Sequence, residues 1–303
     1  MTTIDPAAAP RGSAAVQPSG PPCEPADQPA IVRLSRRPPI LFYAALSWVL
    51  LVVVLAALAS ALPLPDPAQP IGQLRAGSDP SWAGLLGTDG LGRSVLARMI
   101  FGARVSLVIG TVAGLGAFVI GTAAGLVAGF YRGPVDTVIS YLADALLAFP
   151  PLVLLLAMSS VLQPSVTTLL IALAVLMTPT FLRLARANTM SWATREFVQA
   201  ATNLGARPSR LMVREVLPNL LPALASYLPI VVATLIIAEG SLSFLGLGIP
   251  SPTPSWGGMI NDGREYIATN PALVFYPAAA IFLTVFALNV LGDRLRARFS
   301  HSR

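Results

Sequence analysis

Long stretches without a charged residue are the feature that most restricts how this chain can fold. Twenty-eight uncharged residues separate Arg37 from Asp66, and 38 separate Asp144 from Arg183. A helix of about 20 apolar residues crosses the hydrocarbon core of a bilayer. The apolar residues come in continuous runs and not in the one-sided stripes of surface helices, which argues against a soluble protein with an unusually apolar core. The sequence therefore predicts a membrane protein with several spans.

The first apolar run, over residues 40–62, predicts a transmembrane helix. A cleaved signal peptide is the alternative, because residues 57–59 read Ala-Leu-Ala and imitate a cleavage site. The run is too long for an ordinary signal peptide, and it begins too far into the chain. We therefore expect residues 36–64 to form a first membrane anchor.

The second apolar run carries a regular series of glycines. It lies between Arg104 and Arg132, and it places Gly121, Gly125 and Gly129 four residues apart on one helix face. Small residues at this spacing let two transmembrane helices approach closely. The series predicts tight packing inside a helix bundle, with a glycine-lined hinge or pore as the alternative.

The longest uncharged run, residues 145–182, is too long for one span. As a single helix it would extend about 57 Å, nearly twice the thickness of the hydrocarbon core. Gln163-Pro164-Ser165 lies at its midpoint and predicts a tight hairpin. The spans expected from here on cover residues 143–162, 166–183, 220–244 and 272–291. The sequence thus predicts an all-α membrane protein with six transmembrane helices.

The basic residues are distributed unequally between the two sides of the membrane. All 20 are arginines, and six spans place fifteen of them on the side of the termini and five on the other. The positive-inside rule therefore predicts that both termini are cytoplasmic. The resulting domains are a disordered cytoplasmic tail (1–35), the anchor (36–64), an extracytoplasmic loop with an interfacial elbow (65–100), a core (101–296) and a cytoplasmic tail (297–303).

The residue types that catalysis requires are scarce. The Walker A motif needs a lysine that reaches the terminal phosphates of ATP, and this sequence has none. Cys23 and His301, the sole cysteine and histidine, lie in the terminal segments, which argues against a Cys/His metal centre, an intrachain disulfide and a catalytic triad. The arginines flank apolar runs and do not interleave with aromatics, so nucleic acid is not an expected partner. We expect no catalytic residue, metal or cofactor in this chain.

The glycine-rich segment before the second span predicts an interfacial elbow. The turn of residues 88–93 leads into a short helix with apolar residues on one side and Arg93 and Arg98 on the other. A membrane anchor is the simpler interpretation, and contact with a transported solute is the alternative. Trp256 and Tyr266 fit an aromatic belt at the interface.

The fifth span combines prolines with a polar cluster. Pro222 and Pro229 predict a kink. Glu239 lies in the outer part of this span with Ser241 and Ser243 nearby, and an acid in a membrane span is a candidate functional residue. The three residues either form a satisfied polar cluster at a helix end or line a translocation path.

The cytoplasmic loop between the fourth and fifth spans predicts a short amphipathic helix over residues 196–204. The residues that share its apolar face are Phe197, Ala200, Ala201 and Leu204. Gly205 then ends the helix. Such a helix lies either on the lipid surface or in the groove of a partner protein, and its composition leaves both open.

The same loop resembles the "EAA" signature of permease subunits from ABC importers that use a substrate-binding protein. Ala200-Ala201, Gly205, Glu215 and Leu217-Pro218 stand at the spacing of that signature, while Gln199 stands where it often has glutamate. In that family the helix before the glycine is the coupling helix, which sits in a cleft of the ATPase subunit. The resemblance implies that the ATPase-coupling residues of the loop 187–219 are Glu196, Phe197, Ala200, Ala201, Leu204, Gly205, Arg207, Leu217 and Pro218.

Five further stretches are similar to the C-type permease subunit of dipeptide and oligopeptide importers. In order, they are residues 86–96 with 102–107, 148–151, 239–248, 252–257 and 289–293. The resemblance implies a type I ABC importer permease fold in the bacterial inner membrane, with residues 101–296 as the permease core. It also implies a second homologous permease subunit, an extracytoplasmic substrate-binding protein, and two ATPase subunits that carry ATP and Mg.

The expected function is therefore that of a permease subunit importing dipeptides or oligopeptides, with ATP hydrolysed on partner chains. The same architecture carrying a nickel chelate, glutathione or another small solute is an alternative. A stand-alone secondary transporter or channel is a more distant one, because it would be expected to show intramembrane coupling charges, a filter-like loop or an internal repeat of spans.

Overall fold

The computed structural model describes residues 39–71, 84–161 and 165–300. The chain divides into two compact units, Met1–Arg37 and Pro38–Arg303, and all described residues belong to the second. The predicted tail 1–35, the hairpin residues 163–164 and the last three residues of the predicted C-terminal tail lie outside the described residues.

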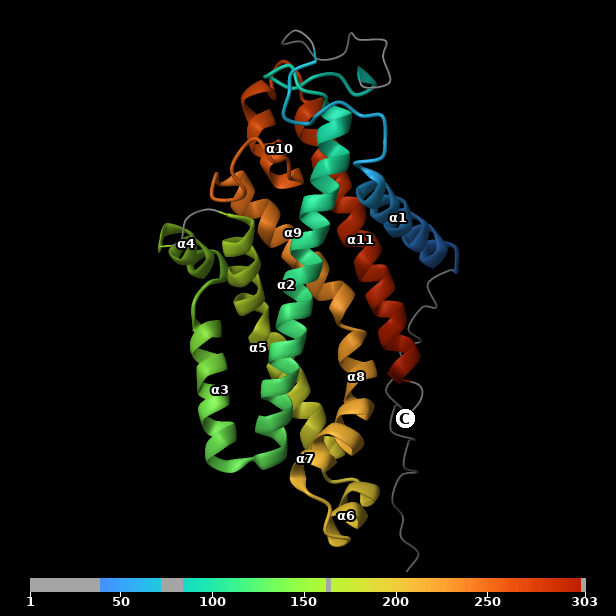
Figure 1. Cartoon of the computed structure of the whole chain (residues 1–303), viewed down its shortest axis with the longest axis vertical. Coiled ribbons are helices and arrows are strands. Elements are labelled where there is room, and N and C mark those ends of the chain that lie inside the picture. Colours follow the sequence, from blue (N-terminus) through green and yellow to red (C-terminus); the bar gives the residue numbers. More distant parts are fainter. Residues whose placement is uncertain (1–38, 72–83, 162–164, 301–303) are drawn as a thin grey trace, which may run out of the picture. The chain divides into compact units, whose positions relative to one another are not determined.

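Helices make up most of the described part of the chain (Figure 1). In order they are α1 (Pro39–Leu58), α2 (Val95–Tyr131), α3 (Gly133–Ala148), α4 (Pro151–Val161), α5 (Val166–Trp192), α6 (Glu196–Asn203), α7 (Pro208–Arg210), the π-helix η2 (Leu211–Val216), α8 (Leu217–Ala225), α9 (Leu228–Phe244), α10 (Trp256–Gly263), the 3₁₀-helix η3 (Arg264–Tyr266) and α11 (Ala272–Ser300). Four are long and apolar enough to cross a membrane, and two bent pairs raise the number to six if each pair is one span.

The third span, predicted over residues 143–162, is a bent pair of helices. Its two parts, α3 and α4, meet at an angle of 90°. Pro150 causes the break, because a proline disfavours helical backbone in the residue before it, and Phe149 is accordingly extended, with φ −83° and ψ 132°. The span also begins earlier than predicted, at Gly133, so that Asp136 and Asp144 both lie within it.

The fifth span bends where its prolines predict a kink. The helical segment Pro208–Ala225 and α9 meet at an angle of 52°. Pro222 lies near the end of α8, and Pro229 occupies the first turn of α9, where its missing N–H is not needed. Between them, the backbone N–H groups of Ser226 and Tyr227 still find carbonyl acceptors, so the bend leaves these two donors satisfied.

The glycine series of α2 marks a close contact with α5, as predicted. A Cβ atom at Gly121 would lie 2.6 Å from the Thr178 carbonyl oxygen, and one at Gly129 would lie 2.7 Å from that of Arg186. At Gly125 it would run into the Leu182 carbonyl. The two backbones therefore touch along three turns, which only glycine permits.

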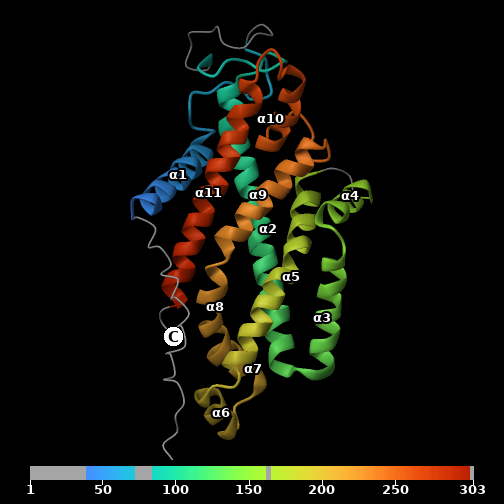
Figure 2. The ribbon, with the colours of Figure 1, turned by 180° about the vertical axis from the view of Figure 1, so that it is seen from behind.

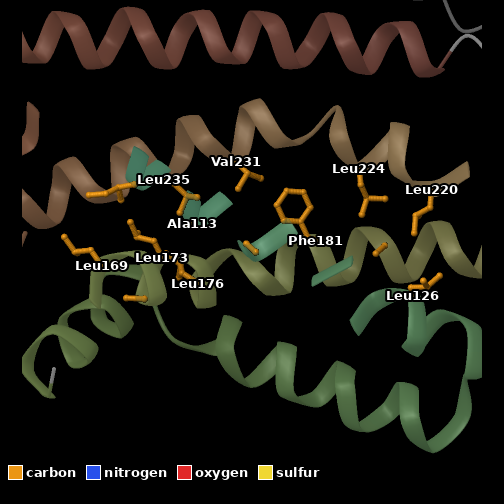
Figure 3. Close-up of a cluster of buried hydrophobic side chains, with 14 of the residues drawn as sticks. Ala113, Leu126, Leu169, Leu173, Leu176, Phe181, Leu220, Leu224, Val231 and Leu235 are labelled. Carbon is orange, nitrogen blue, oxygen red and sulfur yellow. The ribbon is translucent and has the colours of Figure 1, made fainter. Parts of the chain in front are cut away.

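The apolar core lies between α2, α5, α8 and α9. Figure 3 shows Leu224 and Val231 on one side of it and Leu173 and Phe181 on the other. The Phe181 ring meets Phe118 of α2 edge-on, with 5.3 Å between the ring centroids. Helices α5 and α11 both continue beyond the predicted spans, to Trp192 and Ser300, because a helix does not stop at the first charged residue that leaves the membrane. Residues 297–300 of the predicted tail are accordingly helical.

Helix α1 packs on α11 and on the first part of α2, outside the central core. The indole N–H of Trp48 donates to the Thr284 hydroxyl over 3.1 Å. On the other side of α1, large apolar side chains such as Leu50 and Val54 remain exposed, as expected of a surface that meets lipid. The cytoplasmic-loop helix α6 and the helix α10 lie at opposite ends of the described unit (Figures 1 and 2).

Candidate functional site

Helix α6 begins and ends close to the predicted residues. Glu196 occupies its first turn, where a negative charge suits the positive end of the helix dipole. Gly205 follows with φ +81°, a left-handed conformation that favours glycine. The N–H of Ala206 donates to the Ala201 carbonyl over 3.1 Å, and that of Gly205 to the Thr202 carbonyl over 2.9 Å. This is a Schellman ending, and the predicted stop at Gly205 is confirmed.

The predicted apolar face of α6 divides into an inner and an outer part. Val198, which the sequence analysis passed over, is the buried residue of this helix and joins the central core, with Ala201 packed against it. Phe197 and Leu204 point outward and are 41% and 89% exposed. The spacing of Val198 and Ala201, three residues apart, is the signal that would have identified the inner side.

Contacts with the end of α5 hold α6 in place. The rings of Phe197 and Trp192 lie 6.3 Å apart, and the Arg195 guanidinium lies 5.3 Å from the Trp192 ring centroid. The side-chain amide of Gln199 donates to the Thr194 carbonyl over 3.2 Å. Together with the burial of Val198, these contacts present the outer face of α6 on a fixed support.

The remaining predicted coupling residues lie on both sides of the loop. Arg207 precedes α7 and is exposed, as is Pro218 in the first turn of α8, while Leu217 packs against the core. Between them the chain forms the π-helix η2, a form that is frequent at functional sites. The loop therefore combines an exposed polar and apolar surface with buried supporting residues.

The segment predicted as an interfacial elbow has a different structure. The turn 88–93 precedes α2, and the predicted short helix is the first part of α2 itself; Arg93 and Arg98 are buried instead of facing lipid headgroups. Arg93 pairs with Asp89 over 2.7 Å, and Arg98 pairs with Asp262 of α10 over 2.9 Å. Asp89 also lies 3.4 Å from Arg98. One of the acids that neutralise Arg98, Asp262, lies far away in the sequence. The local sequence pattern could not reveal this partner and therefore placed Arg98 at the membrane surface.

Trp256 belongs to the same contact and not to an interfacial belt. It is buried, and its indole N–H donates to the Met99 carbonyl over 3.0 Å. Beside the ion network lies a cavity of about 250 Å³, which Tyr266 and Glu265 border from η3. The structure thus ties α10 to the start of α2 with both charged and aromatic groups.

Glu239 is fully buried between α2, α9 and α10. Its carboxylate accepts hydrogen bonds from the Ser106 hydroxyl over 3.0 Å and from the Ser243 hydroxyl over 2.7 Å. The Ser255 hydroxyl lies 3.5 Å from that of Ser243. Ser241 is less buried, and its hydroxyl donates to the Ile237 carbonyl. The cluster is satisfied in this conformation, and a place of these residues on a translocation path stays a prediction.

Comparison with known proteins decides the family. Residues 121–302 match the family described as binding-protein-dependent transport system inner membrane component. The chain belongs to this family. A probable peptide ABC transporter permease protein of Sinorhizobium fredii, y4tQ, is 38% identical to this permease over 271 residues, which are 89% of the permease and 91% of the relative.

Other relatives are named for the transport of different solutes. The dipeptide transport system permease protein DppC of Alkalihalophilus pseudofirmus is 38% identical over 227 residues, 75% of this permease and 74% of the relative. The glutathione transport system permease protein GsiD of Pectobacterium atrosepticum is 37% identical over 222 residues, 73% and 74% of the two chains. This permease is thus a multi-pass inner membrane component of a transport system.

A solved structure shares the fold. The inward-facing MetNI methionine ABC transporter contains a chain that aligns with a TM-score of 0.57 at 20% identity. The alignment covers 67% of this permease and 97% of that chain. The permease therefore has the type I ABC importer permease fold that its sequence resemblance implies.

Proposed function

We propose that this permease forms half of the translocation path of an ATP-driven importer and that α6 couples it to a separate ATPase subunit. The exposed apolar face of α6, formed by Phe197, Ala200 and Leu204, carries this proposal. An apolar helix face on a rigid support is what a groove on a partner protein recognises. The opposite side of the helix cannot bind a partner protein, because Val198 on that side is buried in the permease core.

ATP and Mg belong to the partner chains in this proposal. The permease has no lysine for a Walker A motif, so the nucleotide is hydrolysed on another chain. The family resemblance implies two ATPase subunits for this role. A second homologous permease subunit completes the path through the bilayer, and an extracytoplasmic substrate-binding protein delivers the solute. The permease itself carries no cofactor and binds no nucleic acid. Both termini and α6 are cytoplasmic, in accordance with the positive-inside rule.

The contacts around α6 suggest how motion of the ATPases reaches the membrane. When ATP binding brings the ATPases together, they displace α6, which is joined to α5 through Trp192 and Phe197. Helix α5 in turn moves with α2, because the two backbones touch at Gly121, Gly125 and Gly129. The two helices therefore act as one stiff lever that reorients the path between inward-open and outward-open states.

Dipeptides or oligopeptides are the proposed solutes. The named relatives with dipeptide and peptide transport in their names support this choice. Glutathione, itself a tripeptide, is the first alternative because another relative carries its name. A nickel chelate or another small solute is a further one. A secondary transporter or channel is disfavoured, since family membership associates the chain with a binding protein.

Substitution of Leu204 tests the coupling role. The permease is reconstituted in proteoliposomes with its partner permease, the two ATPases and the binding protein. Leu204→Asp places a charge on the exposed apolar face, so we expect it to abolish ATP-driven uptake of dipeptide and to release the ATPases on purification. Leu204→Met keeps the face apolar and should retain uptake. Normal uptake by the Asp variant would show that α6 does not couple to the ATPase.

A further inference from the structure

We propose that the cleft between α3 and α5 around Asp144 and Arg183 is a binding point on the translocation path for solutes that carry both a positive and a negative group. The free amino and carboxyl ends of a peptide form such a pair of charges. The inference rests on the proposed function, because it assumes that this chain lines a path for a solute.

The ion pair itself is the first observation. The Arg183 guanidinium donates to the Asp144 carboxylate over 2.6 Å, and the two side chains are 58% and 55% exposed. Both stand on segments that belong to candidate membrane spans. Asp144 lies about 16 Å along α3 from its first residue, Gly133, and Arg183 lies about 14 Å before the end of α5. The pair is therefore well removed from the loops at this end of both helices.

An exposed ion pair on a membrane span is not expected to face lipid. Charged side chains in spans avoid hydrocarbon and face a bundle interior or a water-filled cavity. In this unit the pair is not enclosed by the bundle, since about half of each side chain is exposed. In this proposal, the face of α3 and α5 that carries Asp144 and Arg183 borders water in the assembled transporter, as the wall of a translocation path does.

A second ion pair fixes the geometry of the first. Arg186 donates to the Asp136 carboxylate, with 2.6 Å between Nη2 and Oδ2, and Ser140 donates to the same carboxylate over 3.2 Å. This pair is more enclosed than the outer one. The pair of Arg186 with Asp136 joins α3 to α5. Asp144 and Arg183 remain the more exposed pair of the cleft.

The cleft has the dimensions of a binding site. Its volume is about 350 Å³, and the residues that line it are Ser140, Ala143, Asp144, Leu182, Arg183 and Arg186. Pockets for small molecules begin at about 300 Å³. The position of Arg183 is fixed, because the α5 backbone at Leu182 and Arg186 lies against Gly125 and Gly129 of α2.

The chemistry of the pair suits passage better than tight binding. A half-exposed ion pair contributes little to stability, so a solute can open it at low cost. The solute's ammonium group then takes the place of Arg183 at Asp144, and its carboxylate takes the place of Asp144 at Arg183. Guanidinium binds a carboxylate through two parallel hydrogen bonds. When the solute leaves, Asp144 and Arg183 pair again, which limits how long it is retained.

Transport by charge variants tests the proposal in the complete complex. Asp144→Asn and Arg183→Gln are compared with the native permease for uptake of a dipeptide with free ends, at saturating binding protein. We expect uptake to fall about tenfold or more, the effect of losing one charge-assisted hydrogen bond. The double variant Asp144→Arg with Arg183→Asp restores opposite charges and should recover part of the uptake. Asp66→Asn removes the same charge in an exposed loop and serves as the control.

Native uptake by both single variants would overturn the proposal. Failure of the native permease to import any dipeptide would instead contradict the proposed function, and the cleft is then judged by thiol labelling. In a Cys23→Ser background, Ser140→Cys in the assembled complex should react with a charged, water-soluble thiol reagent. Val138→Cys, on the outer side of α3, should react much more slowly. An unreactive Ser140→Cys would show that protein or lipid closes the cleft, and the proposal would be wrong.

Discussion

At the scale of single residues, Glu239 is a buried acid that requires hydrogen-bond donors from its neighbours. Its carboxylate is fully buried, and the hydroxyls of Ser106 and Ser243 both donate to it. Ser106 belongs to α2, and the backbone N–H of Trp256 in α10 lies 3.4 Å from its hydroxyl. Through Ser106, this side chain connects hydrogen-bonding groups of three helices, and removing it leaves two buried hydroxyl donors without this acceptor.

Truncation of Glu239 should therefore destabilise the permease, and its amide analogue should do so far less. We expect Glu239→Ala to lower the free energy of unfolding by about 2–4 kcal/mol, because buried polar partners remain unpaired. Glu239→Gln retains one oxygen acceptor and should cost less. Thermal unfolding of the purified permease in detergent measures both.

Ser241 provides the matched control for this experiment. It lies two residues away on α9, but its hydroxyl only donates to a carbonyl of its own helix. Ser241→Ala should change the free energy of unfolding by less than about 0.5 kcal/mol. Equal stability of Glu239→Ala and Ser241→Ala would contradict the role of Glu239 as a hub of the three helices.

At the scale of elements, the contact between α2 and α5 organises the described unit. It aligns the core, fixes the arginines of α5 and forms the stiff unit that α6 is proposed to move. The contact depends on missing side chains, since a Cβ at Gly125 would run into the Leu182 carbonyl and lie 2.7 Å from the Ala185 Cβ. Helix bends at Phe149 and near Ser226 then direct the other spans around this pair.

Addition of a single methyl group to this contact should separate the helices. We expect Gly125→Ala to destabilise the permease by about 1–3 kcal/mol through overpacking. Gly116 lies on the same helix, but a Cβ there would meet only the Ala174 Cβ at 3.5 Å, an ordinary contact. Gly116→Ala should therefore be neutral or stabilise by about 0.5–1 kcal/mol. Unfolding in detergent distinguishes the two, and equal effects would contradict the predicted backbone contact.

At the scale of the whole molecule, α6 and α10 lie at opposite ends of the described unit (Figures 1 and 2). The start of α2 meets α10 at one end, while the loop with α6 forms the other. The excess of arginine predicts that the α6 end is cytoplasmic. The α10 end would then be extracytoplasmic.

Thiol labelling in whole cells tests this orientation. In a Cys23→Ser background, a membrane-impermeant thiol reagent should label Leu91→Cys, which is 62% exposed near α10, in intact cells. Leu204→Cys on α6 should be labelled only after the cells are permeabilised. The opposite pattern would reverse the orientation that the positive-inside rule predicts and would remove α6 from the ATPase.

Features that depend on neighbouring residues could be predicted from the sequence. The apolar runs identified the membrane spans, the glycines of α2 predicted a close helix contact, and Gly205 marked the end of α6. Each signal acts within a few turns of helix, because hydrophobic length, backbone conformation and capping are local properties. The family resemblance added the fold, whereas the break of the third span at Pro150 was not predicted.

Only the tertiary structure decided which groups meet across the chain. Arg98 is buried because Asp262 lies against it, and Val198 is the inner residue of α6 because the core lies behind it. The pairing of Asp144 with Arg183 likewise joins two helices that the sequence keeps 39 positions apart. A local sequence pattern shows that a residue is charged, but it does not show which residue neutralises that charge. The partner is brought close only when the helices pack together. The sequence by itself therefore determined the spans and the loop helix, and the packing decided which of their charges are buried, paired or open to a solute.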